Sequence, residues 1–159
     1  MLVVPLLQRF LDYVEAERSY SAHTVRCYRA DLEQFCLFLS ALASDPRAAA
    51  GEMHVNELEP PAEGLDQAWA DNALRGVTAL EVRAFLATMH NSGYSRSTSA
   101  RKLASLRSFY KFLVRTGELA GSPMTAIRTP RQAKRLPKFL DVPQIESLLQ
   151  APDVTTLLG

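Results

Sequence analysis

The chain has 159 residues, of which 47% are hydrophobic and 22% charged, and its formal net charge is +1. A chain of this length and apolar content can bury a core by itself, which excludes the small scaffolds that depend on disulfides or metal ions. It contains no run of about 18 apolar residues and no positively charged leader, so we expect no membrane span, no signal peptide and a cytoplasmic setting.

Two amphipathic helices are predicted in the first 42 residues. The first spans 5–18 and has Pro5 in its first turn, a favoured position for proline. The second begins at Ser21, a good N-cap residue, and continues to Leu42. Apolar residues recur at helical spacing along both segments. The predicted core positions are Leu6, Leu7, Phe10, Leu11 and Val14 in the first helix, and Val25, Tyr28, Leu32, Phe35, Cys36 and Leu39 in the second.

Both cysteines, Cys27 and Cys36, lie in the second predicted helix. Their separation along a helix with a rise of about 1.5 Å per residue is roughly 14 Å, too far for a disulfide, so we expect both thiols to be reduced. The histidines His23, His54 and His90 are scattered along the chain. We therefore expect no metal site and no cofactor.

The segment 44–77 is long for a connection between two helices, and it is rich in Ala, Pro, Gly and acidic residues. From residue 44 to residue 74 it holds one Arg against seven Asp and Glu. This composition predicts either an insertion or a partly disordered segment, a solvated acidic loop in the simplest case. Trp69 indicates a short helical turn that docks on the domain. Its charge would repel nucleic acid.

Two further long helices are predicted after this segment. Thr78 opens the third with the spacing of a capping box, and the helix ends near residues 91–93. The fourth begins at Ser95 or Ser97 and ends before Gly117, a typical residue after a helix C-terminus. No segment alternates polar and apolar residues as a strand does, so the predicted fold class is all-α.

The chain changes character after the fourth helix. A short helical turn is predicted over 122–127, and a basic linker pinned by two prolines follows over 128–140. A new helix begins at Asp141 with a capping box, but too little chain surrounds it to form a core. We expect a helical domain over 1–127, the linker, and over 141–159 the start of a truncated second domain.

The near-zero net charge hides an uneven distribution. Residues 1–92 carry 7 Lys and Arg against 13 Asp and Glu, whereas residues 93–138 carry 11 against a single acid, Glu118. Residues 139–159 add three acids and no base. A local excess of positive charge of this kind is typical of segments that bind phosphates, and it favours a nucleic-acid partner.

The fourth predicted helix carries a polar stripe of hydroxyl and basic side chains next to its apolar face, formed by Thr98, Arg101, Lys102 and Ser105. The apolar face is Leu103, Leu106, Tyr110 and Leu113, and Arg107, Lys111 and Arg115 form a third stripe. Hydroxyls and free N–H groups near a helix N-terminus bind phosphates, and Arg or Lys reaches phosphates or base edges, so the polar stripe suits DNA. The first turns of the second helix offer a similar surface. The candidate DNA-binding residues are Ser21, His23, Thr24, Arg26 and Arg29 in the second helix, Ser95, Arg96, Ser97, Thr98, Arg101, Lys102 and Ser105 in the fourth, and Arg131, Lys134, Arg135 and Lys138 in the linker.

Several of these segments resemble one protein family. The segment 21–35, SAHTVRCYRADLEQF, is similar to the second helix of the core-binding (SAM-like) domain of tyrosine recombinases, and 97–113, STSARKLASLRSFYKFL, is similar to the fourth. The Ser-Pro pair at 122–123 matches the residues that usually follow. The segment 135–140, RLPKFL, resembles the linker into the catalytic domain. The resemblance is closest to Xer-type recombinases and covers nearly the whole chain except 44–77.

The resemblance implies a bundle of four to five helices packed orthogonally. It also implies that this bundle is one jaw of a C-shaped clamp on a DNA half-site, with the second and fourth helices in or beside the major groove. The other jaw of the family carries the catalytic Arg, Lys, His-x-x-Arg pair and nucleophilic Tyr, which cleave one strand without a metal ion. Those residues would fall beyond Gly159, so we expect this chain to bind double-stranded DNA without cutting it. The parent recombinase would act as a homo- or hetero-tetramer on DNA, without a small-molecule substrate.

Two other functions remain open at the level of the sequence. The chain could be a stand-alone helical DNA-binding regulator, although the helix after Asp141 argues for more protein beyond it. It could instead be a protein-interaction module whose basic face meets an acidic partner or its own 44–77 segment. Salt-sensitive duplex binding separates the first two functions from the third.

Overall fold

The computed structural model describes residues 4–16, 20–61, 65–129 and 141–150. Over these residues the chain forms seven α-helices, two short 3-10 helices and no strand, which confirms the all-helical fold class. None of the described helices is long and apolar enough to span a lipid bilayer. The α-helices are α1 (Pro5–Ala16), α2 (Ala22–Ser44), α3 (Pro46–Ala50), α4 (Gln67–Gly76), α5 (Ala79–Asn91), α6 (Arg96–Arg115) and α7 (Val142–Gln150), and the 3-10 helices are η1 (Val55–Glu57) and η2 (Pro123–Ala126).

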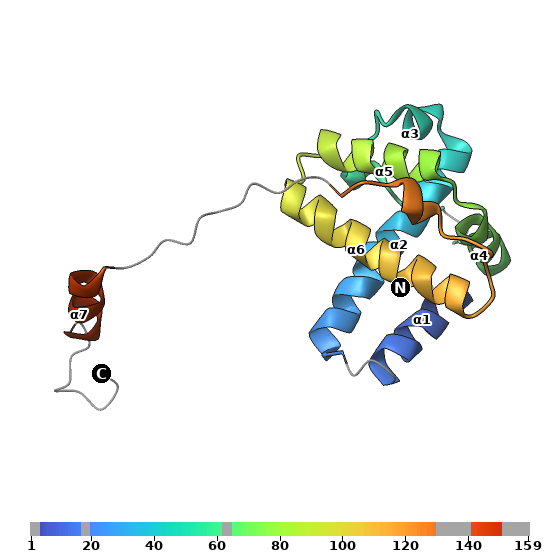
Figure 1. Cartoon of the computed structure of the whole chain (residues 1–159). Coiled ribbons are helices and arrows are strands. Elements are labelled where there is room, and N and C mark those ends of the chain that lie inside the picture. Colours follow the sequence, from blue (N-terminus) through green and yellow to red (C-terminus); the bar gives the residue numbers. More distant parts are fainter. Residues whose placement is uncertain (1–3, 17–19, 62–64, 130–140, 151–159) are drawn as a thin grey trace.

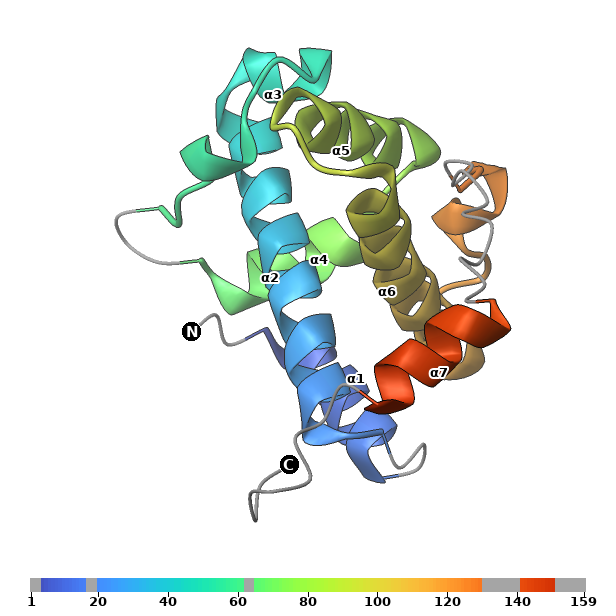
Figure 2. The same ribbon diagram turned by 90° about the vertical axis from the view of Figure 1, so that its left-hand side faces the viewer.

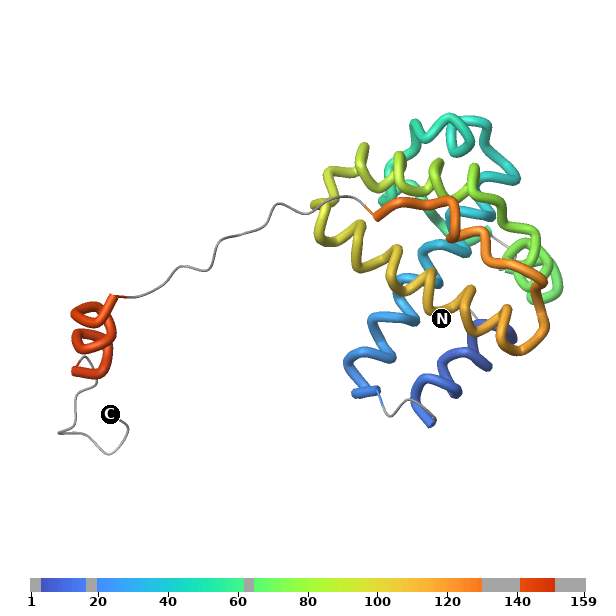
Figure 3. The backbone as a smooth tube through the Cα atoms, in the orientation of Figure 1, coloured from blue at the N-terminus to red at the C-terminus, as the bar shows by residue number. Residues whose placement is uncertain are grey.

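The helix at the centre of the domain is α2, which packs against α1, α3, α4, α5 and α6 and crosses α6 at an angle (Figure 1). In the view turned by 90°, α5 lies across one end of the α2–α6 pair, α1 lies toward the other end, and α4 lies behind (Figure 2). After α6 the chain turns back so that η2 packs against α5 and α6 (Figure 3). The bundle therefore makes α2 and α6 neighbours, although some 50 residues separate them in sequence.

Phe10 of α1 lies in the core where α1, α2 and α6 meet. Its ring centroid is 5.6 Å from that of Tyr28, 5.4 Å from that of Phe109 and 5.5 Å from that of Phe112. The core positions predicted for these three helices are all buried or packed against the core, because each helix turns its apolar stripe inward. A second aromatic cluster joins α2 to α5 and consists of Phe35, Phe38 and Phe85.

Local capping sets the helix boundaries much as the sequence predicts. Ser21 caps α2, and Ser95 rather than Ser97 caps α6. The backbone N–H of Thr78 donates to the carboxylate of Glu81, the reciprocal bond of a capping box at the start of α5. Gly117 follows α6 with a φ of 78°, the left-handed conformation that glycine adopts without strain. The predicted end of the first helix lies outside the described residues.

The prediction of a solvated, partly disordered loop over 44–77 is wrong for the described parts of that segment. They form α3, η1 and α4, and Trp69 lies in α4 packed against the core. The prediction failed because the acidic residues dominate the composition, whereas isolated apolar residues between them decide the packing. The buried side chains of the segment include Ala48, Met53, Leu58, Ala70, Leu74 and Val77.

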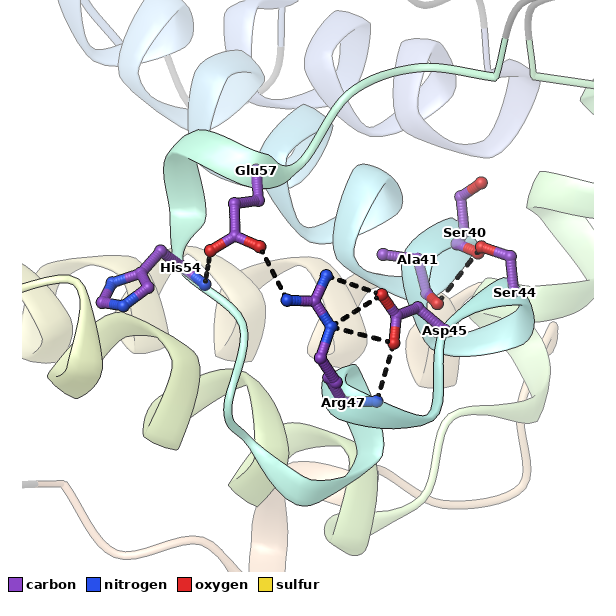
Figure 4. Close-up of polar contacts among 7 residues, drawn as sticks. All are labelled: Ser40, Ala41, Ser44, Asp45, Arg47, His54 and Glu57. Carbon is purple, nitrogen blue, oxygen red and sulfur yellow. Dashed lines mark hydrogen bonds and ion pairs between the residues drawn. The ribbon is translucent and has the colours of Figure 1, made fainter.

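An exposed polar network holds the turn between α2 and α3 (Figure 4). The Asp45 carboxylate accepts a hydrogen bond of 2.8 Å from the backbone N–H of Arg47 and so caps α3. The Arg47 guanidinium pairs with Asp45 at 2.9 Å and with Glu57 at 3.3 Å. The side-chain and backbone hydrogen bonds from Arg47 lower the pKa of Asp45. One arginine thus ties two of the acids of this segment into the fold.

Glu118, the single acid of residues 93–138, closes the bundle at the far end of α6. Its carboxylate pairs with Arg9 of α1 at 2.6 Å and with Arg75 of α4 at 3.0 Å. The hydrogen bonds from Arg9 and then Arg75 hold the pKa of Glu118 below its ordinary value. A carboxylate whose folded-state pKa is lowered stabilises the fold above its unfolded-state pKa, and this contribution is lost as the pH falls through the folded-state pKa.

We expect Glu118→Gln to lower the urea midpoint of unfolding at pH 7, with a gap to the parent chain that closes as the pH falls below about 4. Unfolding curves followed by circular dichroism at pH 7, 5 and 3 provide the measurement. The exposed Glu52, for which no ion pair is found among the described residues, offers Glu52→Gln as the matched control. An equal gap at all three values of pH would contradict the role of the Glu118 charge.

The last described helix, α7, begins with the predicted capping box. The backbone N–H of Gln144 donates to Asp141, and the backbone N–H of Asp141 donates to Gln144. The helix contributes no buried residue, and its apolar side chains are exposed. The division into a domain, a linker and the start of a second domain stays a prediction.

Candidate nucleic-acid interface

The starts of α2 and α6 are built in the same way. The hydroxyl of Ser21 accepts a hydrogen bond from the backbone N–H of Thr24 at 3.3 Å, and that of Ser95 accepts one from Thr98 at 3.1 Å. In each pair the two hydroxyl oxygens are 2.9 Å apart. Both helices begin on the left side of the domain in Figure 1, which is the side that faces the viewer in Figure 2. We call this side, residues 21–29 and 95–101, the α2–α6 start face.

The start face exposes several of the predicted DNA-binding residues. In α2, Arg26 is exposed, whereas Arg29 is partly buried and donates to the side-chain oxygen of Gln8 at 3.1 Å. In α6, Arg96 is exposed in the first turn. Exposed positive side chains therefore lie near the partial positive charge of each helix N-terminus, an arrangement that attracts anions. Ser21, His23, Ser95 and Ser97 are exposed as well, and Thr24 and Thr98 are partly buried.

A buried carboxylate joins the two helices just behind the start face. Asp31 of α2 is 2% exposed, and both of its oxygens accept hydrogen bonds from α6. The Arg101 guanidinium donates to them through its two terminal nitrogens at 2.6 and 3.0 Å. The Lys102 ammonium donates at 2.9 Å and the Ser105 hydroxyl at 2.7 Å. A carboxylate withdrawn from water needs such donors, so this network fixes α2 against α6.

The structure corrects the predicted polar stripe at Lys102 and Ser105. These residues are 7% and 3% exposed. Both are therefore buried, whereas the sequence predicts them on the surface. The Lys102 ammonium also lies 5.7 Å from the ring centroid of Tyr94. Arg101, with a side chain that is 49% exposed, is the member of the stripe that keeps both a core contact and access to solvent. Lys102 and Ser105 are buried because both donate hydrogen bonds to the buried carboxylate of Asp31.

The sequence contains one His-x-x-Arg spacing, at His23 and Arg26. Both residues are exposed at the start of α2, and the His23 ring nitrogen Nδ1 lies 3.7 Å from the Cys27 sulfur. No group of three His, Cys, Asp or Glu in the described residues is arranged to hold a metal ion. The pair lies in the first turns of α2, within the start face.

The two arginines of the third stripe of α6 contact other parts of the domain. Arg107 donates to the backbone oxygen of Ile127 at 2.7 Å and to the hydroxyl of Thr129, which fastens the chain after η2 to α6. Arg115 donates to the hydroxyl of Tyr13 at 2.6 Å and lies over its ring. The four linker candidates, Arg131, Lys134, Arg135 and Lys138, lie outside the described residues.

The sequence did not single out Asp31 as a functional residue. The helical pattern does contain a signal, since Asp31 lies three residues after Tyr28 and four before Phe35 and so shares their inward face. An acid on an apolar face needs a buried partner. Which cations supply it is decided by the packing of α6, which no periodicity within α2 reveals.

Residues 7–59 and 62–117 match the family model of the phage integrase N-terminal SAM-like domain. The match includes α2, α6 and most of the acidic segment. No solved structure matches the chain at a significant level.

Curated relatives are named tyrosine recombinases. The chain is 35% identical over 145 residues to tyrosine recombinase XerC of Listeria innocua, with 91% of this chain and 39% of the relative covered. It is 32% identical over 153 residues to tyrosine recombinase XerC of Oceanobacillus iheyensis (96% and 41% covered). It is also 32% identical over 154 residues to tyrosine recombinase XerD of Listeria monocytogenes (97% and 43% covered). The chain thus spans about two fifths of the length of these relatives.

Proposed function

This chain belongs to the phage integrase N-terminal SAM-like domain family, and we propose that it is the DNA-binding domain of a Xer-like tyrosine recombinase. In this proposal the α2–α6 start face lies against one half-site of duplex DNA. Two capped helix N-termini would meet phosphates, and the exposed arginines would reach phosphates or base edges between them.

The observation that supports the proposal most directly is that Arg101 is both held in place and accessible to solvent. Its guanidinium is held by Asp31, yet about half of the side chain remains open to solvent, and Arg101 lies near the N-terminus of α6. Arg26 and Arg96, in the first turns of α2 and α6, are exposed as well. An arginine that is already oriented loses little rotational freedom on binding, which favours a phosphate or guanine contact.

We propose that this chain binds DNA and that strand cleavage, strand exchange and the tetramer belong to the rest of a longer parent protein. The support is that the relatives named as recombinases are more than twice as long as the matched part. The linker residues Arg131, Lys134, Arg135 and Lys138 would follow the phosphate backbone beside the domain. A cytoplasmic setting is consistent with Cys27 and Cys36, which are both free.

Fluorescence anisotropy of a labelled palindromic duplex, titrated at two low salt concentrations, tests the proposal. If about five phosphates are contacted, the logarithm of the binding constant falls with the logarithm of the salt concentration with a slope near −4.5. Arg101→Ala removes one contact, so we expect binding about tenfold weaker and a slope flatter by about 0.9.

Arg83→Ala is the matched control, because Arg83 is an exposed arginine of α5 outside the start face. It removes the same charge and should leave affinity nearly unchanged. Equal losses from the two variants would refute the start face as the interface. No binding by the parent chain at low salt would instead favour a protein-interaction module, and strand exchange by a full-length parent would exclude a stand-alone regulator.

A further inference from the structure

We infer that Asp31 is a positioning residue for DNA binding, which acts by holding the guanidinium of Arg101 at the start face. The inference rests on the proposed function and goes beyond it, because it assigns different roles to the adjacent cations Arg101 and Lys102. Arg101 would contact the nucleic acid, and Lys102 would hold the two helices together without touching it.

The geometry leaves Arg101 able to bind two partners at once. A guanidinium has five N–H donors in a planar fork, and Asp31 takes one from each terminal nitrogen. The remaining donors belong to a side chain that is 49% exposed, whereas the Asp31 side chain is 1% exposed. Asp31 therefore fixes the inner edge of the fork and leaves its outer edge for a phosphate or a base.

Lys102 lacks this second access. Its side chain is 9% exposed, its ammonium donates to Asp31 at 2.9 Å, and the ring of Tyr94 lies nearby. The cluster holds one carboxylate and two cations, so one positive charge remains in excess. Of the two cations, only Arg101 is accessible to a negatively charged ligand from solvent.

Positioning and simple charge attraction predict opposite effects of removing Asp31. Asp31→Asn raises the local positive charge by one, and Coulomb attraction alone would then tighten binding to a polyanion. If Asp31 instead orients Arg101, its loss frees that side chain and weakens binding in spite of the added charge. The sign of the change thus separates positioning from simple charge attraction, and the cost of Arg101→Ala in each background separates positioning from a merely structural role.

The sharpest test uses Asp31→Asn/Lys102→Met, which leaves the net charge unchanged and leaves no unpaired ammonium in the core. We expect the folded double variant to bind the duplex about five- to tenfold more weakly than the parent chain, since one long side chain must be ordered again on binding. Lys102→Met alone keeps the Arg101–Asp31 pair. It should retain nearly full affinity once the loss of one charge is matched by an exposed control, Lys111→Met.

Arg101→Ala, added to each background, gives the second readout. In the parent chain it should cost about tenfold in affinity, and in the double variant less than twofold, because the side chain it removes is no longer oriented. Circular dichroism and urea unfolding establish that each variant is folded. Should the double variant unfold, Asp31→Glu replaces it, since this change keeps the charge and displaces the carboxylate by one methylene.

Equal costs of Arg101→Ala in both backgrounds would overturn the positioning role while leaving the DNA interface intact. Parent-like affinity of the double variant, or of a folded Asp31→Glu, would overturn it as well. If Arg101→Ala has no effect in the parent chain, the proposed interface itself fails, and the two failures are thereby distinguished.

Discussion

Phe10→Ala is expected to lower the free energy of unfolding by about 4 kcal/mol, a large fraction of the total stability of an ordinary domain. Phe10 is 1% exposed and its ring contacts rings from both α2 and α6. Alanine would remove these contacts and leave a cavity between three helices that cannot all close around it. Urea unfolding followed by circular dichroism measures the change.

Phe10→Leu provides the matched control, because it keeps most of the volume and loses only the ring geometry. We expect this variant to cost about 1 kcal/mol. A loss below about 2 kcal/mol for the alanine variant would mean that the helices collapse onto the vacated space, and the packing of α1 against the α2–α6 pair would then be looser than the structure has it.

Gly51→Ala is expected to cost about 3 kcal/mol, from left-handed backbone strain and from a clash. Gly51 ends α3 with a φ of 72°, and a Cβ atom placed there would lie 2.5 Å from the Cβ of Ala87 in α5. The backbone oxygen of Gly51 also accepts a hydrogen bond from the side chain of Asn91. The glycine therefore lets α3 approach α5 closely and dock the acidic segment on the domain.

Gly93→Ala separates the two causes. Gly93 has nearly the same φ, 76°, but an added Cβ would meet no atom within 4 Å. We expect it to cost about 1 kcal/mol from strain alone. Thermal or urea unfolding of both variants measures the difference, and equal losses at the two positions would show that α3 does not pack against α5 as closely as described.

Much of the start face follows from local sequence. Ser21 and Ser95 predict the two helix starts, since an N-cap serine satisfies an N–H group within its own turn. The exposure of Arg26 follows from its place away from the apolar stripe of α2. The burial of Lys102 does not follow from local sequence. A cation at the edge of an apolar stripe is buried or exposed depending on which side chains the neighbouring helix places opposite it.

The sequence by itself determined the helical class, the ends of α2, α5 and α6, and the apolar faces of α1, α2 and α6, because capping and helical periodicity act within a few residues. Only the tertiary structure decided that the acidic segment after α2 packs into the core. Only the tertiary structure, too, paired Asp31 with Arg101 across about 70 residues of chain. Such contacts form when whole helices pack, and a buried carboxylate selects its partners from whichever side chains that packing brings within hydrogen-bond distance.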